Sequence, residues 1–442
     1  MTAINNKTIW NIGYPIILGN LAQTLIALTD TAFLGRVSAV ALGASMIAGI
    51  YYFVFATLAW GFSIGIQIIV ARRLGEGKLN RIGVVFEHGL AVVLLLAISL
   101  FLIQHCFTEQ LLAQVIQSPN IYAATLEFMA YRHYGISFVC FNFLFRALYI
   151  GLSNTKVISF TTLLMAVVNI VLDYALIFGH WGLPEMGIGG AALASVCAEV
   201  SALLFFIGYT LIKLPLKKYA LFTFHKLEGW LMKSILRLAF PTMLQKLLSF
   251  GSWFIFFILV EHLGEQQTAV SGIIRSVYML IAVPVFAFAA TSNTLTSRLI
   301  GSGSLNEIKP TLLKILRLSL ICISPVLLCC LFFPQLILSV YTNDPSLIAG
   351  AIPSLYVICV AVIGMAFGLT LFEAVSGTGN TTHALWLEMG VLAVYTLSVW
   401  LFAHWPGANV ALVWSCELIY GICIGLASLL YLKFASWQKK RI

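Results

Sequence analysis

The chain has 442 residues, of which 61% are hydrophobic and only 9% are charged, and its formal net charge is +9. Soluble domains carry about 25% charged residues, so this composition excludes an ordinary soluble protein. Apolar stretches of the roughly 20 residues needed to cross a bilayer recur along the whole chain. Because stretches such as 90–103 are apolar on every side rather than alternating, they favour membrane helices over a transmembrane barrel.

Twelve membrane-spanning helices are predicted. Their approximate bounds are 11–34, 42–71, 84–106, 121–148, 157–178, 188–212, 234–260, 268–299, 311–333, 347–375, 382–403 and 408–433. Lys and Arg gather in alternate connections, such as 72–81 and 213–233, whereas the intervening loops 108–120 and 335–346 have none. The positive-inside rule therefore predicts an inner (plasma) membrane protein with the basic loops and both chain ends in the cytoplasm. Since the basic residues belong to these loops, we expect no nucleic-acid partner.

The two halves of the chain repeat at a constant shift. Pro15 matches Pro241, and Arg72 matches Arg298. The same shift gives three pairs of glycines, Gly75 with Gly301, Gly77 with Gly303 and Gly151 with Gly377. Each half has six spans, an even number, so the repeats run parallel about an axis along the membrane normal. We therefore predict two six-helix lobes, at 1–212 and 231–442, a cytoplasmic linker at 213–230, and a central cleft that opens alternately to each side.

Two carboxylates, Asp30 and Asp173, lie inside apolar segments, four or five residues before each segment ends. A charged side chain at membrane depth costs about 2.5–3.5 kcal/mol on insertion scales, so it persists mostly where it serves transport. Both helices are predicted to start in the cytoplasm, which places the two carboxylates at similar depth. Gln23 and Asn169 share a helix face with them, seven and four residues earlier. The alternative role for these groups is hydrogen bonding that holds helices together.

Three motifs occur in order along the chain. They are Thr29–Arg36 (TDTAFLGR), Gly151–Thr155 (GLSNT) running into Asn169–Asp173 (NIVLD), and Gly187–Ser195 (GIGGAALAS). Through them the whole chain resembles the multidrug and toxic compound extrusion (MATE) transporters, most of all their DNA-damage-inducible-F-like branch. The resemblance implies an all-α polytopic membrane fold, with two six-helix bundles related by pseudo-two-fold symmetry. It also implies active efflux of organic, often cationic, compounds driven by inward H⁺ or Na⁺.

In this branch the resemblance implies a coupling site in the N-terminal lobe. The matching positions are Gln23 and Asp30 in the first span, Asn169 and Asp173 in the fifth, and a hydroxyl placed at Ser195 in the sixth. Oxygen atoms of Asp30, Asp173 and Asn169 could hold a dehydrated Na⁺, because hard cations take oxygen ligands. Alternatively, burial and mutual repulsion let the two carboxyls hold a proton near neutral pH. Both coupling ions stay open, and no other cofactor is expected.

Four charged residues inside the C-terminal spans could form a second site for substrate or for part of the coupling. They are Lys246, Arg275, Glu373 and Glu388. The alternative is a set of ion pairs that holds helices together. Glu199 and Glu417 lie inside their spans without evident partners, and Arg132 is expected to pair locally with Glu127.

We therefore predict a secondary active antiporter that exports organic compounds, not an enzyme, because no His-Glu-x-x-His or Gly-x-Ser-x-Gly motif is present. The alternative is a lipid-linked oligosaccharide or lipid flippase of the same superfamily, which should have a strongly basic cleft for pyrophosphate. Only Lys246, Arg275 and Arg146 are available for such a cleft, which argues against this alternative. The expected partners are a small-molecule organic substrate and the lipid bilayer, and the chain is expected to act as a monomer.

Overall fold

The protein is built of helices. The structure, a computed structural model, describes residues 4–439, and no strand occurs in this range. The helices are α1 (Asn6–Val37), α2 (Ala39–Gly75), α3 (Asn80–Ala113), α4 (Pro119–Arg132), α5 (Gly135–Gly151), α6 (Lys156–Phe178), α7 (Gly187–Lys213), α8 (Leu216–Tyr219), α9 (Gly229–Glu261), α10 (Glu265–Gly301), α11 (Ile308–Phe332), α12 (Pro334–Ser339), α13 (Pro345–Gly377), α14 (Thr381–Ala403), α15 (Val410–Trp414) and α16 (Cys416–Phe434). The chain ends, predicted to be cytoplasmic, lie outside the described residues.

The predicted all-α membrane fold is confirmed. Eleven helical segments between residues 4 and 439 are long and apolar enough to cross a membrane, and α4 with α5 makes a twelfth if this bent pair is one span. The predicted span 121–148 is therefore not one straight helix. Helix α4 ends at Arg132, α5 begins at Gly135, and the two helices meet at 53°. This break places the side chain of Arg132 at the middle of a span.

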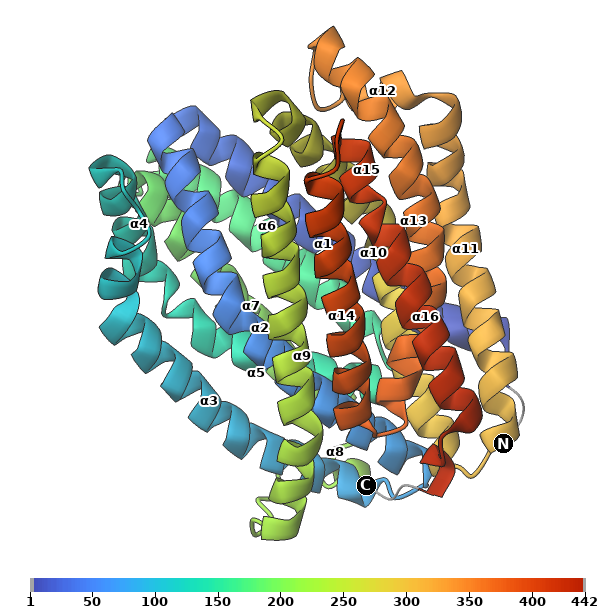
Figure 1. Cartoon of the computed structure of the whole chain (residues 1–442). Helices are drawn as coiled ribbons and strands as arrows, with labels where there is room; N and C mark the ends of the chain where they lie inside the picture. The colour runs from blue at the N-terminus through green and yellow to red at the C-terminus, as the bar shows by residue number, and fades with distance from the viewer. Residues whose placement is uncertain (1–3, 440–442) are drawn as a thin grey trace. The chain divides into compact units, whose positions relative to one another are not determined.

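The chain forms two compact units. Unit 1 consists of Met1–Ile17, Ala71–Gly77 and Phe240–Ile442, and unit 2 consists of Leu18–Val70 and Lys78–Ala239. In unit 1, α13 packs against both α10 and α16, and in unit 2, α6 packs against α7 (Figure 1). The chain passes between the units inside three continuous helices, α1, α2 and α9, and once in a loop. The predicted linker lies within unit 2, and the lobe boundaries stay a prediction.

The predicted linker, residues 213–230, is fixed to the beginning of α3. The carboxylate of Glu87 accepts hydrogen bonds from three consecutive backbone N–H groups, at residues 223–225. His88 Nε2 accepts one from the backbone N–H of Glu228 at 2.7 Å. Two hydrogen bonds from Arg81, each 3.2 Å long, hold the pKa of Glu228 below its usual value. The linker is therefore an ordered part of unit 2.

Packing at matched positions is the same in the two repeats. A Cβ atom at Gly151, at the end of α5, would lie 3.0 Å from the carbonyl oxygen of Gln67 on α2. A Cβ atom at Gly377, at the end of α13, would press in the same way on the carbonyl oxygen of Asn293 on α10. Both the glycines and the carbonyls are related by the sequence shift. This agreement supports the predicted duplication.

Gly75 and its repeat partner Gly301 permit a second close approach, within unit 1. A Cβ atom at Gly75 would clash with the carbonyl group of Arg298, and one at Gly301 would clash with that of Arg72. We expect Gly75→Ala to destabilise the protein by about 1–3 kcal/mol, because backbone atoms cannot move aside as a flexible side chain can. The measurement is the Tm of the detergent-purified protein.

Gly208→Ala is the matched control for this substitution. It also adds one methyl group to a helix, but no atom lies within 4 Å of its Cβ position. A Tm for Gly75→Ala equal to that of Gly208→Ala would contradict the close approach of the two helix ends.

Candidate functional site

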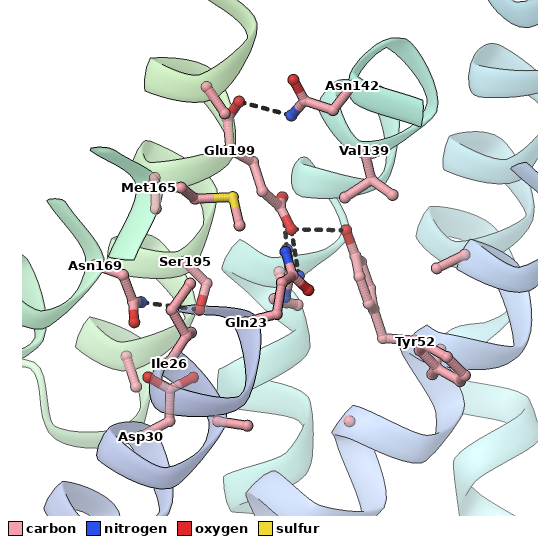
Figure 2. A pocket seen from close by; sticks show the side chains of 18 of the residues that line it. Gln23, Ile26, Asp30, Tyr52, Val139, Asn142, Met165, Asn169, Ser195 and Glu199 are labelled. Atoms are coloured by element: carbon pink, nitrogen blue, oxygen red, sulfur yellow. Dashed lines mark hydrogen bonds and ion pairs between the residues drawn. The ribbon is translucent and has the colours of Figure 1, made fainter. Parts of the chain in front are cut away.

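A cavity of about 430 Å³ lies within unit 2. Helices α1, α2, α4, α5, α6 and α7 line it, and α3 takes no part. Asp30, Asn169 and Ser195 project into it from three different helices (Figure 2). Four of the five predicted coupling residues line this cavity, and the fifth, Asp173, lies directly beside them.

The carboxyl groups of Asp30 and Asp173 lie within hydrogen-bonding distance of each other. Two ionised carboxylates are both acceptors, so a hydrogen bond between these groups forms only when one of them carries a proton. Asp30 lines the cavity, whereas Asp173 is completely buried. Within residues 4–439, no donor reaches Asp173 Oδ1. A buried oxygen without a donor is costly, and this one is suited to a proton or a cation.

Asn169 connects the carboxyl pair to α7. With its amide in one orientation, Nδ2 donates to Ser195 Oγ at 3.5 Å. With the amide reversed, Nδ2 donates to Asp30 Oδ1 at 3.0 Å and to Asp173 Oδ2 at 3.3 Å. The second orientation makes two hydrogen bonds to the carboxyl groups instead of one to the hydroxyl, and it is the better assignment. Gln23 lines the same cavity, but among the described residues it makes no hydrogen bond to this group.

The donor set fits a proton directly and a Na⁺ ion in part. Two carboxyls and one hydroxyl offer oxygen ligands of the kind that hard cations take, and Asn169 would add its amide oxygen only with Oδ1 turned toward the carboxyls. In the described part of the chain, no group of three His, Cys, Asp or Glu residues lies close enough together to hold a metal ion. The predicted Na⁺ at Asp30, Asp173 and Asn169 stays a prediction.

A buried ion pair lines the cavity, and it was not predicted from the sequence. Arg132 at the break after α4 pairs in a two-pronged geometry with Glu199 on α7, at 2.6 and 2.9 Å. Its guanidinium lies 3.6 Å from the centre of the Tyr52 ring. The Tyr52 hydroxyl donates to Glu199 at 3.5 Å (Figure 2). The predicted local pair of Arg132 with Glu127 is therefore wrong.

Part of this arrangement could have been predicted from spacing. Glu199 is four residues after Ser195, so the two share one face of α7. A residue on the face that holds a predicted coupling group should also face the cavity. The position of Arg132 could not be predicted in this way, because the break between α4 and α5 redirects it.

In unit 1, Lys246 and Glu373 are close together, as a second charged site would require. Lys246 Nζ lies 3.6 Å from Glu373 Oε1, and Asn293 Nδ2 donates to Glu373 Oε2 at 3.0 Å. Glu388 is near enough to both charges to interact electrostatically. Arg275 is apart from them, with its guanidinium 5.4 Å from the centre of the Phe257 ring. Three of the four predicted residues thus cluster, and their role stays a prediction.

Glu417, for which the sequence offered no partner, is enclosed by neutral donors. The Tyr278 and Tyr395 hydroxyls donate to it at 2.7 Å each, and Trp253 Nε1 donates at 3.3 Å. A buried carboxylate with three donors needs no counter-ion nearby to be retained. The three donors come from three helices, so this residue ties α9, α10 and α14 to α16.

Comparison with protein families gives one match that spans most of the chain. The family described as MatE matches residues 15–175 and again residues 241–399. The two matched segments begin at Pro15 and Pro241, the first residues paired by the internal repeat. The duplication found in the sequence is therefore also a duplication of this family's domain.

Two relatives share the description "Probable multidrug resistance protein NorM". The one from Agrobacterium fabrum is 30% identical over 266 residues, which are 59% of this chain and 56% of the relative. The chain thus spans little more than half of that protein's length in this match. The one from Thermotoga maritima is 25% identical over 457 residues and covers 99% of this chain and 94% of the relative.

Solved structures share the fold. One, described as the outward-facing conformation of a multidrug resistance MATE family transporter of the MOP superfamily, has a TM-score of 0.90 at 20% identity. It covers 99% of this chain and 97% of that chain. A MATE in a bent conformation has a TM-score of 0.86 at 20% identity, with 97% and 94% covered. At this identity the likeness concerns the fold.

Proposed function

Because the chain belongs to the MatE family of transporters, we propose that it exports organic compounds in exchange for H⁺, with Na⁺ as the alternative coupling ion. It is a transporter and not an enzyme. The observation that carries the proposal is the contact between Asp30 and Asp173 at the wall of one cavity. The names of its relatives as multidrug resistance proteins support a substrate range of small organic molecules.

The exchange follows from competition at the carboxyl pair. When the pair is ionised, it attracts a positively charged group of the substrate into the cavity. Proton uptake neutralises the pair and removes that attraction. A coupling ion shifts a conformational equilibrium only as far as it prefers one conformation. We propose that the protonated pair favours a state in which α1 bends at Pro15 or Gly19 and the substrate leaves outward.

The cavity walls suit flat amphipathic molecules. Phe53 and Phe143 line it together with Met46 and Met165. Aromatic faces attract cations, and methionine side chains adapt to different shapes. A volume of about 430 Å³ lies within the range of small-molecule sites.

The location of the protein in an inner membrane, with cytoplasmic chain ends and a monomeric state, is part of this proposal. The basic loops support the orientation through the positive-inside rule. The flippase alternative is less well supported, since the Arg132 charge is already neutralised by Glu199. Pyrophosphate would need several free cations in the cavity.

Transport into proteoliposomes tests the proposal. The purified protein is reconstituted, a pH gradient or a Na⁺ gradient is imposed alone, and accumulation of a fluorescent organic cation is followed. We expect the pH gradient to drive accumulation, and a protonophore to abolish it. Accumulation driven only by Na⁺ would select the alternative ion. Uptake that follows neither gradient would overturn the exchange mechanism.

A further inference from the structure

Two histidine rings face each other where α3 passes the break between α4 and α5. His105 Nδ1 lies 3.4 Å from His133 Nε2. His105 is exposed, and it lies one turn before the exposed residue Glu109, near the end of α3 that the positive-inside rule predicts to be outside. His133 is buried and directly follows Arg132, in the break at residues 133–134. Neither histidine lines the cavity, and neither takes part in the proposed exchange.

The hydrogen bond on the other side of the His133 ring determines which nitrogen is free. His133 Nδ1 donates to the backbone carbonyl of Met129 at 2.6 Å. A carbonyl oxygen only accepts, so Nδ1 carries the proton, and in the neutral ring Nε2 has a free electron pair. Nε2 is the nitrogen that faces His105. Histidines that bind metal ions have this same arrangement, in which the second nitrogen donates to a carbonyl or a carboxylate.

The distance between the two nitrogens is that of two ligands of one metal ion. Hydrogen bonds donated by N–H are usually about 2.7–3.2 Å long, so a separation of 3.4 Å is long for such a bond. Two nitrogens that bind one tetrahedral Zn²⁺ at about 2.0–2.1 Å are themselves about 3.3–3.4 Å apart. The two rings therefore need little movement to receive an ion.

Aromatic packing holds both imidazole rings in place. Phe101, one turn before His105 on α3, stacks on the His105 ring with centres 5.6 Å apart and an angle of 8° between the planes. The same Phe101 ring lies 5.4 Å from the His133 ring, and the Tyr134 ring lies 4.2 Å from it, centre to centre. Ligands that are already held in position lose less conformational entropy when they bind an ion.

We propose that His105 and His133 form a binding site for a borderline divalent metal ion of the Zn²⁺ type, which joins α3 to the break between α4 and α5. Imidazole nitrogen is a preferred ligand of such ions. Within residues 4–439 no third His, Cys, Asp or Glu completes the site, so water fills the remaining positions and the ion is exchangeable. The ion enters at the exposed His105. Once bound, it holds the break in the form that places Arg132 beside Glu199.

Zinc binding to the full chain tests the proposal without any transport measurement. The protein is purified in detergent without a histidine tag and washed with a chelator. ZnCl₂ is then titrated in competition with a zinc-sensitive fluorescent chelator. We expect one Zn²⁺ per chain, and an affinity that falls about 10-fold or more in His105→Ala. His105→Ala is the main variant because this side chain is exposed, and His133→Ala, at a buried position, should lose zinc in the same way.

Thermal unfolding gives a second measurement. At a concentration about 100-fold above its Kd, Zn²⁺ should raise the Tm of the wild type by about 2 °C or more, because it binds the folded chain. His105→Ala should lose this shift. MgCl₂ should give no shift in either protein, because Mg²⁺ takes oxygen ligands.

His180→Ala is the matched control. His180 is also exposed and also stacks on an aromatic ring, that of Tyr174, with ring centres 4.4 Å apart. This variant should keep both the zinc affinity and the Tm shift. A wild-type protein that binds no equivalent of Zn²⁺ overturns the proposal, and so does His105→Ala with the zinc affinity of the wild type. An equal loss in His105→Ala and His180→Ala also overturns it, because zinc would then bind exposed histidines in general.

Discussion

Asp173→Asn should reduce gradient-driven efflux to the level of passive leak. Asparagine has nearly the same shape as aspartate, but it cannot bind and release a proton or supply a negative charge. The carboxyl of Asp173 lies within hydrogen-bonding distance of Asp30, so a neutral amide at this position leaves no carboxyl pair that could share a proton. Asp30→Asn should have the same effect for the same reason. The measurement is substrate accumulation in proteoliposomes after a pH gradient is imposed.

Asp344→Asn is the matched control, at the third aspartate of the chain. Asp344 caps α13 by accepting hydrogen bonds from the backbone N–H and the hydroxyl of Ser346, each at 2.8 Å. These bonds hold its pKa below the usual value, so it stays ionised and carries no proton at neutral pH. Asparagine also caps helices well. Normal transport by Asp173→Asn would show that the pair is not the coupling site.

Arg132→Met should destabilise the protein by about 3–5 kcal/mol, because it leaves the buried carboxylate of Glu199 without its charge partner. Both side chains of this pair are nearly buried, with relative exposures of 12% and 10%. The double variant Arg132→Met with Glu199→Leu should recover much of the loss, since apolar side chains of similar size replace a buried pair at little cost. Thermal unfolding of the four proteins in detergent measures this coupling.

The more exposed pair of Arg81 with Glu228 provides the comparison. Its side chains have relative exposures of 37% and 31%, so water screens the interaction. We expect Arg81→Met to change the Tm much less than Arg132→Met does. A double variant at Arg132 and Glu199 as unstable as the sum of its single variants would contradict the assignment of a coupled pair.

The sequence predicted those features that depend on periodicity and repetition. The twelve spans follow from apolar length, and the duplication follows from pairs such as Pro15 with Pro241. That Asp30 and Asp173 have similar depth followed from the direction of their helices. The contact between the two carboxyls agrees with this predicted similar depth, because groups at different depths in a membrane could not meet.

Contacts that depend on the rotation of a helix or on a break could not be predicted. The predicted span 121–148 contains no proline, so nothing in it indicated the 53° bend that redirects Arg132. Nearly uniform hydrophobicity also conceals which side of α5 faces the cavity. The sequence therefore left open whether Arg146 faces a cleft, and the structure places it on the cavity wall. The tyrosines around Glu417 were hidden for the same reason.

The places where the chain crosses between the units have a mechanical consequence. Three of the four crossings lie within continuous helices, at residues 17–18, 70–71 and 239–240. The linker is not one of the crossings, because it lies within unit 2 and is held on α3. Pro15 and Pro241 lie two residues or fewer from two of these crossings. Because the chain crosses these three points as helix and not as a flexible loop, a movement of one unit would have to bend the helices themselves. The duplicated prolines interrupt the helical hydrogen-bond ladder, so we expect any such bending to be concentrated at these two positions.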